Sequence, residues 1–565
     1  MTAIPELNLR MFPLRFPALV FLLLPGSVMG QAAGPSDSLP GRPITSDLVI
    51  RHCSACHTRD STGRMSRLSY LRKAPEGWQT SVRRMATLNG VQLEPDAARE
   101  IVRYLANQHG LSPEEANAGR FEVERRMIDY TYAADKDTES TCKACHSMGR
   151  VLLQRRTKEE WELLVAMHRG YYPTVDFQGF RRFGPPPDSG DGRHPMDKAI
   201  EHLAKAFPLE TPAWQAWSAT MRPPRLAGTW LLSGQEPGAG PIHGRVIINA
   251  DPARPDEFTT EITWQYARDG RRVSRRGRAL IYTGFQWRGR SLAGNAEESA
   301  LREVMTVDRD WQTISGRWFT GGYDELGPDV TLRRLGRDVV VLGVEPQALR
   351  RGGGEQEVRI YGANFPSSVA AGAVDLGPGV RVTGVTGSGD RLTVRVRVDS
   401  AAAIGRRDGF VAGAPVKDAL VIYDQVHRLR IAPQAGMARV GGVVFPKQLQ
   451  QFDATGWHDG PDGKPGTGDD LPLGSVPVAW SLEEYSVTYD DDDLKYVGTI
   501  DQKGLFTPAP DGPNPERSGQ RNNVGDVWVV ARYTPPGGGA AVTGRAHLLV
   551  TVPLYMRWEP WRATP

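Results

Sequence analysis

The sequence predicts a multidomain chain in which an N-terminal all-α domain is followed by three all-β domains. Its 565 residues exceed the roughly 250 to 300 that one hydrophobic core supports, so the chain must divide. Apolar residues recur at helical spacing up to about residue 220, and alternation with period two then takes over. The 62 glycines and 43 prolines favour turns and short strands over much of the length.

The overall composition excludes several classes of protein. Hydrophobic residues make up 40% of the chain and charged residues 24%, with a mean hydropathy of -0.40. These values are typical of a folded globular protein, and not of a bundle of membrane spans or a disordered chain. The 69 Lys and Arg against 65 Asp and Glu leave a net charge of only +4. We therefore expect no nucleic-acid partner.

The first 30 residues are typical of a secretory signal peptide. Arg10 and Arg15 precede an apolar run over residues 16–25, and small residues follow up to about Gln31, where the mature chain is expected to begin. The run is about half the roughly 20 residues that a membrane-spanning helix needs. We therefore predict export to the periplasm and no membrane span in the mature chain.

The four cysteines of the chain form two C-x-x-C-H motifs, Cys-Ser-Ala-Cys-His at 53–57 and Cys-Lys-Ala-Cys-His at 142–146. This spacing is that of c-type haem attachment, in which two thiols form thioethers and the adjacent imidazole ligates the iron. A four-thiolate zinc site and two disulfides are the alternatives, but neither explains a histidine after both pairs. The expected thioether residues of the two covalently bound haem c groups are Cys53, Cys56, Cys142 and Cys145, and the expected proximal ligands are His57 and His146.

Helical patterns surround both motifs, which predicts a dihaem cytochrome c domain over residues 31–223. Residues 45–47 can cap a short helix before the first motif, and apolar spacing predicts further helices over 95–109, 158–168 and 195–207. Aligning Trp78 with Trp161 places Met85 and His168 at equivalent positions. We therefore predict an internal duplication.

A low-spin haem needs a second axial ligand, and the duplication proposes Met85 for the first haem and His168 for the second. A thioether ligand raises the reduction potential relative to a second imidazole, so the two irons would differ in potential. Other methionines and histidines remain alternatives: Met65 or Met127 for Met85, and Met167 or His202 for His168. Three more histidines are expected to be solvent-facing or structural: His52, His109 and His194. Trp78 and Trp161 either pack on a porphyrin or fill the core.

Three β-domains are predicted over the rest of the chain. Alternating residues over 258–266, a turn at 268–270, a return strand over 279–287 and strands at 303–307 and 313–319 indicate an antiparallel barrel over 224–337. Strand patterns at 339–344, 358–361 and 392–398 indicate an immunoglobulin-like sandwich over 338–436. The patterns at 476–482, 527–533 and 547–552 indicate another immunoglobulin-like domain over 437–565.

One acidic loop raises the question of a calcium site. Asp459, Asp462, Asp469 and Asp470 fall among glycines, and oxygen ligands suit calcium, but the spacing differs from that of an EF-hand loop. A solvated turn is therefore the first interpretation. No hydrolase triad, zinc-protease or nucleotide-binding motif stands in a suitable setting in the β-domains. We predict no catalytic residue in this chain.

With its export signal, its duplicated C-x-x-C-H motifs and three β-domains in this order, the chain resembles the alpha subunit of quinohemoprotein amine dehydrogenase over nearly its whole mature length. The segment 456–471 adds to this resemblance. The resemblance implies a hetero-oligomer with a β-propeller subunit and a small subunit whose cysteine tryptophylquinone oxidises primary amines. It also implies electron transfer through one His/Met haem and one bis-His haem, with Met85 and His168 as the matching residues, to a soluble blue-copper protein or cytochrome c.

Two other functions remain open on the sequence. The chain could be the dihaem electron-transfer subunit of a different periplasmic dehydrogenase, which would co-purify with a quinone-free partner. It could also be an exported scaffold whose β-domains bind a polymer or cell surface.

Overall fold

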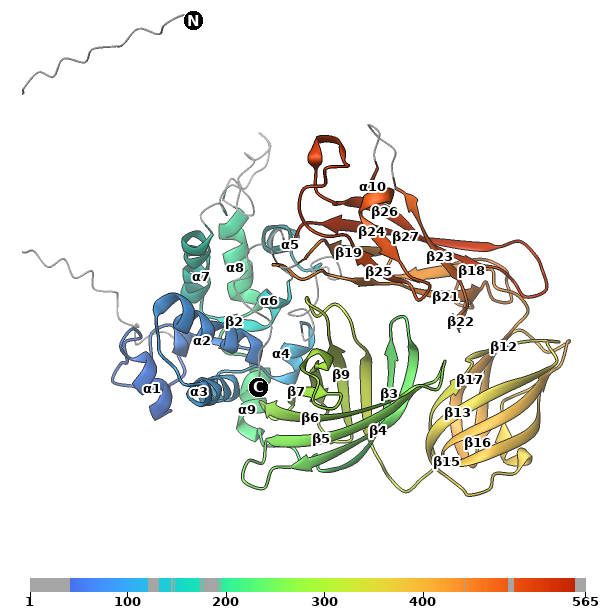
Figure 1. Ribbon diagram of the computed structural model, residues 1–565. Helices are drawn as coiled ribbons and strands as arrows, with labels where there is room; N and C mark the ends of the chain where they lie inside the picture. The colour runs from blue at the N-terminus through green and yellow to red at the C-terminus, as the bar shows by residue number, and fades with distance from the viewer. Residues whose placement is uncertain are drawn as a thin grey trace, which may run out of the picture.

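The computed structural model describes residues 41–119, 132–143, 146, 148–172, 175, 193, 195–442, 444–485 and 492–553. A helical domain (blue to teal in Figure 1) is followed by a barrel domain (green), a sandwich domain (yellow) and a C-terminal domain (orange to red). The predicted signal peptide lies outside the described residues. Within the described part, no helix combines the length and apolar character that crossing a bilayer requires.

The helical domain contains helices and one small sheet, so its prediction as all-α was incomplete. A two-stranded antiparallel ribbon pairs β1 (Leu71–Lys73) with β2 (Gln154–Arg156). Its helices are α1 (Asp47–Cys53), α2 (Pro75–Asn89), α3 (Pro95–Gln108), α4 (Pro113–Asn117), α5 (Lys136–Lys143), α6 (Gly149–Leu152), α7 (Lys158–Tyr171), α8 (Pro195–Ala206) and α9 (Pro212–Thr220).

The β1–β2 ribbon relates two halves of the helical domain to one another. Each strand leads within two residues into a helix, α2 or α7, whose fourth residue is a buried tryptophan. The backbone hydrogen bonds repeat as well: Lys73 N donates to His109 O at 3.0 Å after α3, and Arg156 N donates to Phe207 O at 3.2 Å after α8. The predicted duplication is therefore present in the fold. The two tryptophans fill the cores of the two halves.

The barrel domain is a closed antiparallel barrel in the order β10-β3-β4-β5-β6-β7-β8-β9. Side chains at alternate positions of β5 point into its core, as predicted: Phe258, Thr260, Ile262, Trp264 and Tyr266 are all buried. The predicted return strand over 279–287 was wrong, because a tight turn with positive φ at Thr283 and Gly284 divides that run between two strands. The strands are β3 (Gly228–Glu236), β4 (Gly240–Ala250), β5 (Glu257–Tyr266), β6 (Arg272–Tyr282), β7 (Gln286–Leu292), β8 (Leu301–Val307), β9 (Thr313–Phe319) and β10 (Asp329–Arg334).

The sandwich domain packs two sheets around an apolar core rich in valine. The first sheet consists of β11 (Val340–Glu345), β13 (Glu355–Phe365) and β15 (Val380–Val398). The second consists of β12 (Ala348–Arg350), β17 (Ala414–Tyr423), β16 (Gly405–Val411) and β14 (Val374–Asp375). Its relation to immunoglobulin domains stays a prediction.

The C-terminal domain contains three sheets around a separate core. The first sheet consists of β18 (Arg428–Ala432), β21 (Asp453–His458) and β22 (Leu471–Ser475). The second consists of β19 (Ala435–Arg439), β27 (Val542–Thr551), β26 (Gly525–Tyr533) and β23 (Ala479–Glu484). The third consists of β20 (Gln450–Gln451), β25 (Leu505–Pro508) and β24 (Gly498–Ile500). A short helix, α10 (Asp493–Tyr496), lies near β23 and β26.

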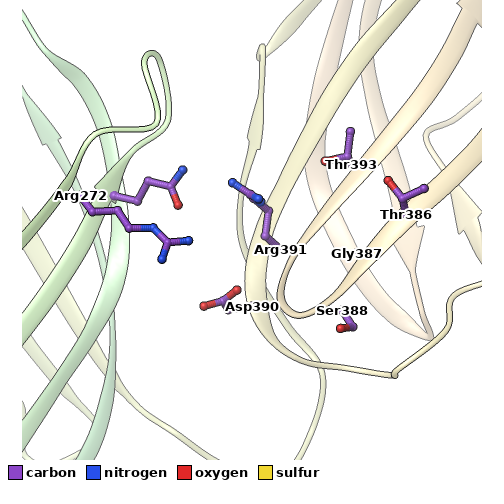
Figure 2. Close-up of a pocket in the computed structure, with 8 residues that line it drawn as sticks. Arg272, Thr386, Gly387, Ser388, Asp390, Arg391 and Thr393 are labelled. Atoms are coloured by element: carbon purple, nitrogen blue, oxygen red, sulfur yellow. The ribbon is translucent and has the colours of Figure 1, made fainter.

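Polar contacts join the barrel domain to its neighbours. Arg288 forms an ion pair with Glu76 at the start of α2, and Trp217 Nε1 of α9 donates to Thr283 O at 2.8 Å. A cavity of about 320 Å³ lies between the barrel and the sandwich domain, where Arg272 of β6 faces Asp390 and Arg391 of β15 (Figure 2). It is lined by polar side chains and lies outside the helical domain, so it does not belong to the predicted haem sites.

Candidate haem sites in the helical domain

The first C-x-x-C-H motif begins at the last residue of α1. Ser46 caps this helix by accepting a hydrogen bond from Val49 N at 3.3 Å, as predicted from the sequence. Cys53 ends the helix and is half-buried, whereas Cys56 is exposed in the turn that follows. In that turn the backbone N of His57 donates to Cys53 O at 2.9 Å. The turn therefore brings the backbone of His57 back to the end of α1.

The tautomer of His57 suits a metal ligand. Its Nδ1 lies 2.9 Å from Ser66 O, and because a carbonyl can only accept, Nδ1 carries the proton. Nε2 therefore keeps its lone pair. The pKa of His57 is lowered overall. Burial and the charge of Arg67 lower it, and together they outweigh the Ser66 carbonyl, which raises it. The ring is thus neutral near pH 7, as iron ligation requires.

The second motif begins within α5, where Cys142 is half-buried against the core of the second half of the domain. Cys145 lies outside the described residues. The ring centroids of His146 and His168 are 6.4 Å apart, and the rings are inclined at 39°. A ligating imidazole nitrogen lies about 2 Å from a transition metal and the ring centroid about 1 Å farther, so two rings on opposite sides of one ion have centroids about 6 Å apart. The pair fits a bis-imidazole iron.

His168 carries the same tautomer as His57. Its Nδ1 lies 2.7 Å from Leu164 O, one turn back in α7, so Nδ1 donates and Nε2 keeps its lone pair. Burial lowers the pKa of His168, and the guanidinium groups of Arg84, Arg156 and Arg150 lower it further, against the Leu164 carbonyl. This imidazole is also neutral near pH 7.

Met85 occupies the eleventh residue of α2, and His168 is the eleventh residue of α7. The side chain of Met85 is half-buried, and the Asn89 amide nitrogen lies 3.9 Å from the Met85 sulfur. A thioether is only a weak hydrogen-bond acceptor, so this contact leaves the sulfur free to ligate a metal. The repeat thus places Met85 at the position equivalent to that of His168.

The other methionines and histidines considered as haem ligands lie in different surroundings. Met65 is fully buried in the apolar core of the first half, and His202 Nε2 lies 2.8 Å from the Tyr132 hydroxyl. His109 is buried beside Trp78, and burial lowers its pKa to about 3. Met167 and His52 are half-buried, and Met127 and His194 lie outside the described residues.

A buried carboxylate that the sequence analysis missed connects the two halves. Glu115 accepts from Arg72 at 2.7 and 2.8 Å, from Thr211 at 2.8 Å and from Ser112 N at 2.9 Å, and Arg155 lies 3.3 Å away. Burial raises the pKa of Glu115, but the two guanidinium groups outweigh it, so the net shift is downward. The sequence signal was a capping box at 112–115, which indicates a helix start and not an ion pair.

A second missed carboxylate bridges the halves near the predicted ligands. Glu160 of α7 pairs with Arg67, which follows the first motif, at 2.9 Å, and with Arg156 of β2 at 3.3 Å. Its side chain is only 4% exposed. The electrostatic field between the two candidate haem sites therefore includes this buried charge.

The acidic loop at 459–470 uses its carboxylates internally. Arg428 binds Asp459 and Asp470, the latter at 2.7 Å, and Asp469 accepts from Asp462 N at 3.2 Å. Asp462 in turn accepts from Lys464 N at 2.8 Å. These contacts are those of a turn stabilised by its own amides and one guanidinium.

Models of one protein family match successive parts of the chain from residue 44 to residue 561. Models for the alpha subunit of quinohemoprotein amine dehydrogenase match here: its haem-binding domain at residues 44–214, domain II at 223–335, domain III at 338–424 and domain IV at 429–561. A comparison with curated proteins gave no match.

The solved structures that match include two designed proteins. A redesigned β-barrel is 17% identical, with 20% of this chain and 92% of that chain covered and a TM-score of 0.17. A de novo fluorescence-activating β-barrel is 21% identical, with 21% and 97% covered and a TM-score of 0.15. These scores carry no functional information. The four family models do, and because they cover nearly the whole length, the chain belongs to the alpha-subunit family of quinohemoprotein amine dehydrogenase, an oxidoreductase family whose first domain binds haem.

Proposed function

We propose that this chain is the electron-transfer subunit of a periplasmic amine dehydrogenase and binds two covalently attached haem c groups. The observation that carries the proposal is the His146–His168 pair, whose spacing suits two axial ligands of one iron. Two C-x-x-C-H motifs and the membership of the family support it. When bound, the haems supply irons that exchange single electrons.

We assign Cys53 and Cys56 to the thioethers of the first haem, whose iron His57 and Met85 would ligate. Cys142 and Cys145 would hold the second haem, and His146 and His168 would ligate its iron. The carbonyls of Ser66 and Leu164 orient two of these imidazoles by accepting their Nδ1 protons, as outer partners of ligating histidines commonly do. A thioether on one iron and two imidazoles on the other set different reduction potentials.

Catalysis of amine oxidation is assigned to other chains of the assembly. By the family, a small subunit with cysteine tryptophylquinone and a β-propeller subunit are the partners, and a soluble blue-copper protein or cytochrome c is the acceptor. The charged segment and apolar run before Gln31 support export to the periplasm. The β-domains supply surface for the sister subunits in this proposal.

The test is reduction of the haems by substrate in the native assembly. The complex is purified from the periplasm, and primary amines are mixed with it anaerobically while the haem absorbance is followed. We expect primary amines to reduce the haems and a tertiary amine, which cannot form the same imine-type product, to leave them oxidised. Reduction only by the substrate of a different co-purifying dehydrogenase would contradict the amine assignment but not the electron-transfer role.

A further inference from the structure

A group of metal-ligating side chains lies far from the haem sites, at the junction between the sandwich and C-terminal domains. This junction cluster consists of Asp424, His427 and His458. Asp424 directly follows β17, His427 directly precedes β18, and His458 is the last residue of β21. The cluster therefore takes ligands from both domains and from the chain between them. The proposed electron-transfer function uses none of the three residues.

The three side chains converge closely. One nitrogen from each imidazole and one carboxylate oxygen of Asp424 all lie within 4.8 Å of one another. The two rings stack with centroids 4.1 Å apart and an inclination of 29°. His458 Nε2 lies 3.2 Å from Asp424 Oδ1. Ligands about 2 Å from one ion can be at most about 4 Å apart, so binding requires only a small approach.

His458 is the most informative member of the cluster. Its side chain is 3% exposed, and its Nδ1 is buried without a hydrogen-bond partner among the described residues. A buried polar atom with no partner is unfavourable, and a metal ion bound at Nδ1 would supply the missing partner.

Neighbouring groups can support ligation. His427 Nδ1 accepts a hydrogen bond from Asp459 N at 3.0 Å, which fixes the orientation of this ring. Arg351 holds the other oxygen of Asp424 at 2.8 Å, which fixes the orientation of that carboxylate. An apolar cluster shared by the two domains, including Val421 and Leu473, secures the elements on which the ligands stand.

We propose that the junction cluster binds a divalent transition-metal ion, best represented by zinc. Imidazole nitrogen is a preferred ligand of zinc, whereas calcium requires oxygen ligands alone. Two nitrogens and one oxygen leave a fourth tetrahedral position for water. Because Asp424 directly follows a strand of one domain and His458 ends a strand of the other, the bound ion links the sandwich and C-terminal domains.

The test measures zinc binding by the full-length, haem-loaded chain after treatment with a chelator. Isothermal titration with zinc chloride is carried out on the wild type and on D424N and H427Q, whose side chains are partly exposed and whose replacement spares the core. The matched control is H547Q, because His547 forms a similar pair with Asp526 at 2.9 Å but belongs to no metal-ligating group among the described residues. We expect one saturable site in the wild type and H547Q, and an affinity at least tenfold weaker in D424N and H427Q.

Two further readouts accompany the titration. At the same zinc concentration, the unfolding temperature rises more in the wild type and H547Q than in D424N and H427Q, because a ligand stabilises the state that binds it in proportion to its affinity. Zinc X-ray absorption of the loaded wild type shows imidazole nitrogen ligands. Equal affinity in all four proteins, no saturable site in the wild type, or a shell of oxygen ligands alone would overturn the proposal. None of these outcomes bears on the haem assignment.

Discussion

Arg72 lies directly opposite Arg155 in the β1–β2 ribbon, and both guanidinium groups turn to the single buried carboxylate of Glu115. The two arginines occupy equivalent positions of the duplicated unit. The hydrogen bonds from Thr211 and Ser112 complete the coordination of the carboxylate. This ion cluster therefore joins the two halves of the helical domain.

We expect Glu115→Gln to destabilise the folded protein by about 3–5 kcal/mol, because it leaves two buried guanidinium groups without their counter-charge. Denaturant unfolding of the haem-loaded chain measures the change. Glu114→Gln is the control: the neighbouring Glu114 pairs with Arg309 at the surface, with 54% of its side chain exposed, and is expected to change stability by less than about 1 kcal/mol. Similar losses in the two variants would show that the Glu115 cluster is not a structural hub.

The distal-ligand assignment predicts opposite shifts of reduction potential in two variants. His168→Met raises the potential of the second haem, and Met85→His lowers that of the first, because thioether ligation favours the reduced iron more than imidazole does. Optical redox titration separates the two components. Met65→Leu is the control for the first haem, since Met65 belongs to the apolar core. A potential shift in M65L with none in M85H would move the assignment to Met65.

The buried charge of Glu160 is expected to lower the haem potentials. Glu160→Gln removes a negative charge between the two candidate haem sites. Because that charge favours the more positive, oxidised iron, its loss favours the reduced iron and raises both reduction potentials. Glu162→Gln, two residues along the same helix, is the control because its pair with Lys158 is exposed to solvent. Potentials unchanged in E160Q, or shifted equally in both variants, would contradict this electrostatic role.

Acid stability depends in part on His109. Its pKa is about 3 in the folded protein against an ordinary 6.5, because burial disfavours the charged ring. Between these values the unfolded chain binds a proton that the folded chain does not, so stability falls as the pH falls from 6.5 towards 3. Unfolding free energies measured across this window are expected to fall less steeply in His109→Gln. The same slope in the variant and the wild type would contradict the shift.

The features that could be predicted from the sequence are those carried by residues close to one another along the chain. Each C-x-x-C-H motif places its two cysteines and its histidine within five residues, and Met85 and His168 were found from a repeat that is visible in the spacing after each tryptophan. The alternation over 258–266 likewise predicted which side chains of β5 are buried.

Features that depend on distant contacts were not predictable. Glu115 meets Arg72 and Arg155 only after folding, and its sequence context indicates no more than a helix start. The β1–β2 ribbon has only three residues in each strand, too few for an alternating pattern. The strand predicted over 279–287 was wrong because Thr283 adopts a positive φ that its residue type does not favour. The junction cluster brings together residues on either side of a domain boundary.

The most direct test of the central claim is the intact mass of the exported wild-type chain and of C142S/C145S, measured under denaturing conditions that release any haem not bound covalently. We predict the mass of the mature polypeptide plus two haems for the wild type, and plus one haem for the variant. A wild-type mass equal to that of the bare polypeptide, or one reduced only by the hydrogens lost in disulfide formation, would contradict the account.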